Sequence, residues 1–285
     1  MANSYTSYRV VKTISNNLVR ARDVNDRDVF LTGKGIGFGK KQNDIISNEH
    51  VESVFSLETK KEQSLYEELL NTTSPALIEV ANEVISYIQS QFTTPLNEHI
   101  HVALTDHIAF MVRRCKMGIP IENPFSIETA SLYPRETEVA KHAVEILEEK
   151  LRLNIPSDEI GFITLHIITS LSEKTFHKIQ QETALLDKLI SIIESQFQIS
   201  VKTDDLNYSR LVTHIRFLLE RQDRNEFLTA PVEMMEHVRT YYPICYTVAY
   251  KLVKTIEQYT GSSVPDNEIF YLALHVYRFS NSLAN

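Results

Sequence analysis

The sequence has little of what marks secreted, disulfide-bonded or membrane-spanning proteins. Its 285 residues include two cysteines, Cys115 and Cys245, which stand far apart and outside any metal-binding spacing. No apolar run approaches the length of a membrane span, and the first residues, MANSYTSYRVVKT, lack the apolar stretch of a signal peptide. We therefore expect reduced thiols and a cytoplasmic protein.

Glycine is also scarce, and its distribution is uneven. Four of the seven glycines fall on alternate positions of GKGIGFGKK at residues 33–41. This spacing matches neither the dinucleotide-binding fingerprint nor the P-loop. Alternate glycines on a strand would leave one face without side chains, so that another backbone, from a partner strand or a ligand, could approach closely.

Charge is divided between two parts of the chain. The net charge of −8 argues against nucleic acid when it is taken as an average. Residues 1–57, however, carry eight Lys or Arg and six Asp or Glu, a balance of +2, and the remainder carries −10. The division suggests one module for a polyanion and another module for a different partner.

Two kinds of segment follow one another along the chain. Strand-like stretches separated by turn-forming residues precede residue 58, where a charged helical pattern begins. The stretches are YRVVKTI, LVRARDV, VFLTGKGIGFG, DII and VESVFSL. They predict a small antiparallel sheet or barrel of about fifty residues, which is marginal alone and would gain stability by dimerising.

The helical part contains an internal repeat. Residues 131–167 align without a gap on residues 240–276, and DHIAFMVRR at 106–114 aligns on THIRFLLER at 213–221. A duplicated unit of roughly a hundred residues has a normal domain size, so the repeat predicts two homologous all-α helical-bundle domains.

Histidine persists twice in each copy of the repeat. His107 aligns with His214, and His166 aligns with His275. A single histidine in such an apolar context is more often a buried, neutral, hydrogen-bonded side chain than a functional group. Recurrence of both histidines in both copies favours a function, although a shared fold could also preserve them.

An arginine follows each upstream histidine by seven residues. Arg114 follows His107 and Arg221 follows His214, and two helical turns bring each pair nearly onto one face. The arginine could steady a negatively charged adduct on the imidazole, or it could be an ordinary solvated side chain. Asp106 precedes His107 and could tune its basicity, although neighbours on a helix face apart.

Three chemistries could use such histidines. His99 and His101 with His107 have the character of metal ligands, which His166 could join, but the repeat carries no counterpart of the first two. Hydrolysis by a Ser-His-Asp arrangement lacks a nucleophile elbow in this sequence. The third use is as a phosphate acceptor, because an imidazole takes a phosphoryl group from another phosphohistidine with little change in bond energy. This use requires no cofactor, and we expect none.

The glycine segment offers groups that suit RNA. Phe38, on the opposite alternation from the glycines, can stack on a base. Lys34, Lys40 and Lys41 would meet phosphates, and Asn17 can hydrogen-bond to base edges. The alternative is a glycine-rich strand that packs against a dimer mate with Phe38 in the core. The positive balance of this part of the chain favours RNA.

ISNNLV, GKGIGFGKK, LTDHIAF, DEIGFITLHI and NEIFYLALHV occur in this order, and together they resemble the transcriptional antiterminators that regulate bacterial sugar phosphotransferase genes. The resemblance spans essentially the whole chain. LNEHIHVALTDHIAF and NPFSIETASLYP are most similar to the glucose-system members of that family.

The resemblance implies an RNA-binding β-barrel domain at residues 1–60, which works as a symmetric dimer, and phosphotransferase regulation domains at residues 61–172 and 173–285. The barrel would hold a leader RNA hairpin whose formation precludes a terminator hairpin. The family's RNA contacts fall on Lys12, Asn17, Gly33, Lys34 and Phe38. Its regulatory phosphate acceptors fall on His107, His166, His214 and His275.

The resemblance also implies partners. The sugar permease of the phosphotransferase system, here expected to carry glucose, would phosphorylate the first regulation domain, and the histidine-phosphorylated carrier protein would act on the second. We expect a homodimer without membrane insertion, and a regulator in place of an enzyme. Two rivals use the same histidine-bearing repeats: a metal-dependent regulator, and a DNA-binding regulator, which is disfavoured because residues 1–57 show no helix-turn-helix pattern.

Overall fold

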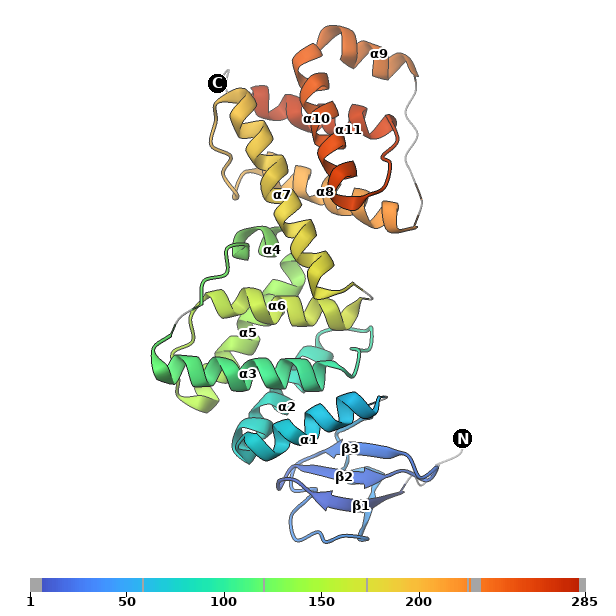
Figure 1. Ribbon diagram of the computed structural model, residues 1–285, viewed down its shortest axis with the longest axis vertical. Helices are drawn as coiled ribbons and strands as arrows, with labels where there is room; N and C mark the ends of the chain where they lie inside the picture. Colours follow the sequence, from blue (N-terminus) through green and yellow to red (C-terminus); the bar gives the residue numbers. More distant parts are fainter. Residues whose placement is uncertain are drawn as a thin grey trace. The chain divides into compact units, whose positions relative to one another are not determined.

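A computed structural model describes residues 7–57, 59–119, 121–172, 174–224, 226 and 232–281 (Figure 1). The chain divides into two compact units. The first unit contains everything described before residue 124 together with residues 135–174, and the second contains residues 124–134 together with the described residues from 175 onward. The domain boundaries expected at residues 60 and 172 stay predictions.

The first unit begins with a five-stranded antiparallel sheet, as the strand pattern predicts. Its strands are β1 (Ser7–Thr13), β2 (Leu18–Arg22), β3 (Asp28–Thr32), β4 (Ile45–Ser47) and β5 (Ser53–Phe55), in the order β4-β1-β2-β3-β5. Val19 and Ala21 on one face of β2 join an apolar cluster that includes Ile36, and Leu18 on the other face joins a cluster that includes Tyr66. The sheet therefore has two apolar faces, covered by a loop residue and by helical residues respectively.

The glycine segment is a loop, so the prediction that it continues the strand is wrong. β3 ends at Thr32, and residues 33–39 form successive turns, such as the one closed by the hydrogen bond from Phe38 N–H to Gly35 O at 3.0 Å. Gly35 and Gly39 have φ angles of +69° and +68°. These angles lie in the left-handed region, which a strand does not use.

The four glycines of the loop fall into two pairs with different physical roles. Gly35 and Gly39 supply the left-handed backbone, and a Cβ on either would meet open space. At Gly33 and Gly37 a Cβ would lie 2.3 Å from a backbone oxygen, which real structures do not tolerate. The alternation therefore arises from a chain that turns and makes close approaches at alternate residues, and not from one bare face of a strand.

We expect alanine substitutions to separate these two pairs. Gly35→Ala should cost about 1–2 kcal/mol of unfolding free energy, because it places a side chain in the left-handed region. Gly33→Ala should cost more, because the backbone at His50 must move away. Urea unfolding followed by circular dichroism measures both. Gly35→Asn is the control, since asparagine tolerates positive φ. Equal costs for the two alanine variants would contradict the close approach at Gly33.

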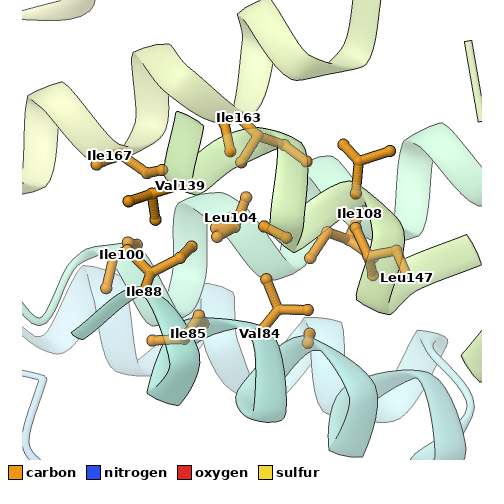
Figure 2. Packing of buried hydrophobic residues seen from close by; sticks show 14 of the residues in the cluster. Val84, Ile85, Ile88, Ile100, Leu104, Ile108, Val139, Leu147, Ile163 and Ile167 are labelled. Atoms are coloured by element: carbon orange, nitrogen blue, oxygen red, sulfur yellow. The ribbon is translucent and has the colours of Figure 1, made fainter. Parts of the chain in front are cut away.

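The helices of the first unit enclose their own apolar core (Figure 2). They are α1 (Lys60–Thr72), α2 (Pro75–Ser90), α3 (Ile100–Met117), α5 (Pro134–Leu151) and α6 (Asp158–Leu171). Thr59 and Glu62 form a capping box that starts α1, and Gly118, with a φ angle of +67°, ends α3. The core includes Val84, Ile88, Leu104, Ile108, Leu147 and Ile163.

An aromatic stack joins the sheet to these helices. Phe55 on β5 stacks on His101 near the start of α3, with ring centroids 3.5 Å apart and planes 4° from parallel. Tyr66 on α1 meets the edge of Phe55 at 5.8 Å. Burial lowers the pKa of His101 to about 3, and its Nδ1 lies 3.3 Å from Asn82 Oδ1. α3 therefore begins against the sheet and carries His107 further along.

The second unit repeats this helical arrangement. Its helices are α4 (Ser126–Leu132), α7 (Phe176–Phe197), α8 (Leu206–Arg224), α9 (Val232–Tyr241), α10 (Pro243–Thr260) and α11 (Asn267–Asn281). α8, α10 and α11 repeat α3, α5 and α6, which bears out the two helical domains. α4 comes from inside the first repeat but packs here: Tyr133 Oη donates to Glu182 Oε2 at 2.6 Å, and Tyr208 Oη donates to Ser131 Oγ at 3.0 Å.

Candidate RNA surface and histidine sites

Four of the five predicted RNA contacts lie together at the glycine loop. Asn17, in the turn between β1 and β2, holds the loop through its backbone oxygen, which accepts from Gly33 N–H at 3.1 Å. Its side-chain Oδ1 accepts from Gly35 N–H at 2.7 Å. Lys34 and Phe38 project from the same loop. The fifth contact, Lys12, lies on β1 with its side chain exposed.

The loop presents apolar and basic groups to solvent. The side chain of Phe38 is 77% exposed, so it does not belong to the core of this chain. Lys34 is exposed as well, whereas Gly33 is buried beneath it. Lys40 is half-buried, and its Nζ donates to Ile45 O at 3.3 Å. An exposed aromatic ring beside lysines is an arrangement that stacks on bases and meets phosphates.

The first unit brings its two predicted acceptor histidines together. His107 lies on α3 and His166 on α6, and their ring centroids are 5.0 Å apart. Phe162, one turn before His166 on α6, has its ring 5.8 Å from that of His107. Both histidines are half-buried. Two histidines that are 59 positions apart in the sequence therefore lie side by side in the fold.

A buried carboxylate holds the upstream histidine of this pair. Glu159, at the start of α6, has no exposed surface. His107 Nε2 lies 3.0 Å from Glu159 Oε2, and Arg114 Nη2 donates to Glu159 Oε1 at 2.6 Å. Arg114 is 6% exposed, so the interpretation of it as a solvated side chain is wrong. The seven-residue spacing of His107 and Arg114 lets one helix contact both oxygens of one carboxylate.

The second unit repeats this arrangement with looser contacts. The ring centroids of His214 and His275 are 5.0 Å apart. Glu268 is buried, and its Oε2 lies 3.2 Å from His214 Nε2. Arg221 Nη2 donates to Glu268 Oε1 at 2.9 Å, and 19% of the Arg221 side chain is exposed. The repeat therefore preserves a group of four side chains, of which the carboxylate is the centre.

The carboxylates set the chemistry of the upstream histidines. Burial raises the pKa of Glu159, but the hydrogen bonds from His107 and Arg114 outweigh burial and hold that pKa below its ordinary value. The same balance lowers the pKa of Glu268. An ionised carboxylate can only accept, so Nε2 of His107 carries a proton, and in the neutral ring the lone pair is on Nδ1.

The downstream histidines are held neutral. Burial, with a smaller effect of the charges of His107 and His99, lowers the pKa of His166 to about 3. Burial, with the charges of His214 and nearby arginines, lowers the pKa of His275 to about 4. A neutral imidazole has a nitrogen lone pair at physiological pH, which is what a phosphate acceptor needs.

The histidines proposed as metal ligands do not converge. His101 stacks on Phe55, the Nδ1 of His99 lies 3.0 Å from Glu62 Oε1, and His107 contacts Glu159. Within the described ranges of the chain, no group of three His, Cys, Asp or Glu side chains could hold a metal ion.

Among the helices that the structure describes, none is both long and apolar enough to cross a membrane.

Glu159 and Glu268 belong to the site, although the sequence does not predict them as members of it. The signal was present, because the two glutamates align with one another across the repeat. A carboxylate near a helix start is common on protein surfaces, and the sequence alone does not reveal that these two are buried. Asp106, the carboxylate that the sequence argument considered, is exposed.

Comparison with known proteins extends these observations. Residues 8–64 match the model of the CAT RNA binding domain, and residues 82–170 and 187–279 each match that of the PRD domain. The chain is 40% identical over 278 residues to a protein of Bacillus subtilis (strain 168) named PtsGHI operon antiterminator, with 98% of this chain and 99% of that protein covered. It is 34% identical over 279 residues to Protein GlcT of Staphylococcus haemolyticus (strain JCSC1435), with 98% of each covered.

A solved structure also matches. The crystal structure of GlcT CAT-PRDI is 44% identical in sequence and superposes with a TM-score of 0.55, covering 58% of this chain and 99% of that one.

We expect Arg114→Met to destabilise the first unit by about 3–5 kcal/mol, because it leaves Glu159 buried without its cation. Arg113→Met, which changes the exposed neighbour, is the matched control and should stay within about 0.5 kcal/mol. Arg221→Met should cost less than Arg114→Met, since Arg221 is partly solvated. Urea unfolding at pH 7 measures all three. Equal losses of unfolding free energy in Arg113→Met and Arg114→Met would show that the Arg114–Glu159 ion pair does not stabilise the first unit.

The cost of Arg114→Met should depend on pH. In the wild type the pKa of Glu159 is lowered, so its ionised form adds stability above the ordinary value of 4.5, and this contribution is lost as the pH falls through the lowered pKa. In the variant, burial without Arg114 favours the neutral carboxyl group. The difference in unfolding free energy between the wild type and Arg114→Met should therefore shrink as the pH falls below 4.5, toward the lowered pKa of Glu159.

Proposed function

This chain belongs to the family of transcriptional antiterminators in which a CAT RNA-binding domain precedes PRD domains, and we propose that the glycine loop is its RNA surface. Phe38 and Lys34 are the exposed groups of the loop, Asn17 and Gly33 hold it in shape, and Lys12 adds charge from β1. The hairpin bound there would belong to a leader transcript of a sugar permease gene, with glucose as the expected sugar.

Dimerisation of the CAT domain follows from its size and its edges. A sheet of about fifty residues buries little apolar surface alone. Its two edge strands are three residues long and carry exposed apolar side chains, Ile45 at 55% on β4 and Val54 at 40% on β5. A second copy of the domain would cover these side chains and complete a barrel. The RNA would then meet two symmetric copies of the loop.

The acceptors of the regulatory phosphate are His107, His166, His214 and His275. In each transfer the lone pair of a bare ring nitrogen attacks phosphorus while the P–N bond of the donor's phosphohistidine breaks, and the electron pair of that bond stays on the donor ring. One phosphoryl group moves to the acceptor and one proton moves back to the donor. The recurrence of the same histidine pair, at 5.0 Å in both units, carries this proposal.

The buried carboxylate makes phosphorylation a switch. A phosphoryl group adds close to two negative charges and several acceptor oxygens, by analogy with phosphate esters. Placed on His107, it repels Glu159 and competes for Arg114, so the resting arrangement cannot persist. The sugar permease would drive this change in the first PRD domain and switch RNA binding off, whereas the carrier phosphoprotein would act on the second. The protein would be a cytoplasmic regulator, not an enzyme.

We expect Phe38→Ala to weaken binding of a leader RNA hairpin by about 1–3 kcal/mol, the range for one base stacked on an aromatic ring. Val24→Ala is the matched control, because Val24 is also an exposed apolar side chain of the sheet domain, at 65%, but lies outside the loop. Electrophoretic mobility shifts with the full chain measure both. Unchanged affinity in Phe38→Ala would remove the ring from the RNA surface.

We expect phosphate on the four paired histidines and not on His50, His142, His177 or His237, which have no partner across the repeat. Mass spectrometry after incubation with the permease and carrier phosphoprotein maps the sites. In cells, His107→Ala and His166→Ala should each give readthrough of the terminator without sugar, at normal protein levels. Phosphate concentrated on His142, or full sugar dependence of both alanine variants, would contradict the proposed control.

A further inference from the structure

Three consecutive residues before α3 tie the helical domain to the sheet and to α6. Asn97 N–H donates to Ser170 O at 2.7 Å, next to the end of α6. Glu98 Oε2 accepts from the backbone N–H of Ser56 at 2.7 Å, directly after β5. His99 Nδ1 lies 3.0 Å from Glu62 Oε1 in the first turn of α1. Residues 97–99 are called the junction below.

A pocket of about 350 Å³ opens between the junction and α6. Its lining includes Glu62, Asn97, His99, His166, Thr169 and Ser170. The acceptor His166 therefore shares one cavity with a second histidine and with a carboxylate. The two histidines are close enough that a charge on His99 contributes to the low pKa of His166, after burial and the charge of His107.

The side chains that line the pocket would interact with a phosphoryl group bound there. A phosphoryl group on His166 that enters this pocket meets one group that can be cationic, His99, and one anion, Glu62. Attraction and repulsion act in the same direction, because both favour moving His99 away from Glu62 and toward the phosphate. The polar side chains of Thr169 and Ser170 line the same cavity.

We propose that His99 is the reader of phosphate on His166: it leaves Glu62, pairs with the phosphoryl group, and so transmits the modification from α6 to the connection between the PRD domain and the sheet. The inference rests on the proposed function, since it assumes that His166 accepts a phosphoryl group. It adds His99, which is not itself an acceptor. Because His99 lies beside His166, phosphorylation of His166 affects the RNA-binding domain by this route and phosphorylation of His275 does not.

Glu62 is placed to pass the change on. Its Oε2 accepts from Thr59 N–H at 3.2 Å and from Thr59 Oγ1 at 2.8 Å, which closes the capping box of α1. Gln63, the next residue, donates from Nε2 to Leu57 O at 2.8 Å. The start of α1 is thus bonded to the segment that follows β5. Repulsion of Glu62 by a phosphate acts directly on this connection.

The second PRD domain lacks this reader. When the repeats are aligned through His107 and His214, the position of His99 is taken by Leu206, which is 61% exposed. Phosphate on His275 therefore has no equivalent histidine to attract. The histidine is thus present in the first PRD domain, which follows the sheet directly in the chain, and is replaced by Leu206 in the second.

The test uses the full chain with His214 and His275 replaced by alanine, so that His107 and His166 of the first PRD domain are the remaining acceptors of the four. This background is compared with the same chain carrying His99→Gln. The matched control carries His142→Gln, because His142 is also an exposed histidine facing a glutamate, Glu145, at 4.0 Å. Phosphate at position 166 is measured by mass spectrometry, and affinity for the leader hairpin is measured with and without phosphorylation.

Phosphorylation should weaken RNA binding by about ten-fold in the background and in His142→Gln, and by less than about three-fold in His99→Gln, with equal phosphate on His166. Amide exchange at Glu62 should accelerate on phosphorylation in the background alone. Equal weakening in all three proteins would overturn the role of His99 and leave the acceptor role standing. Absence of phosphate on His166 in the background would overturn the acceptor role, and the inference with it.

Discussion

A buried carboxylate in each helical domain is the constraint to which the rest of the regulatory site is fitted. Glu159 and Glu268 have no exposed surface, and an unpaired carboxylate in that position would be costly. One helix supplies both partners, an imidazole and a guanidinium two turns apart, so that each oxygen of Glu159 has its own donor and each oxygen of Glu268 has one of the two groups within 3.2 Å. The upstream histidine, a proposed phosphate acceptor, is thus part of an electrostatic balance. A change of charge on the histidine, the arginine or the carboxylate alters the electrostatic interactions of the other two.

The RNA-binding domain is organised around a different constraint, a small sheet with two apolar faces. Ile36 of the glycine loop belongs to the cluster on one face, and Phe38, two residues later, is exposed. The same segment therefore completes the core and presents the ring. The hydrogen bonds from the loop to Asn17 therefore hold two things at once, because a loop that moved would uncover the core as well as displace the proposed RNA surface.

The sequence was sufficient for the elements and insufficient for the burial of charge. Alternating apolar residues predicted the strands, and the repeat predicted the two helical domains and the recurrence of two histidines in each, but not that the two histidines of a domain lie side by side. The alternate glycines predicted a strand, but the same spacing of two also arises in a loop where close-approach and left-handed positions alternate. The role of Glu159 cannot be predicted from its own segment, because its partners His107 and Arg114 come from α3. The contact of His99 with Glu62 joins residues 37 positions apart that no motif connects.

The position of α4 separates the unit of sequence repetition from the unit of folding. The segment 124–134 belongs to the first copy of the repeat by alignment, yet it completes the second folded unit through Tyr133 and Glu182. A gene that lost its first repeat at the alignment boundary would also remove a helix from the domain it retained.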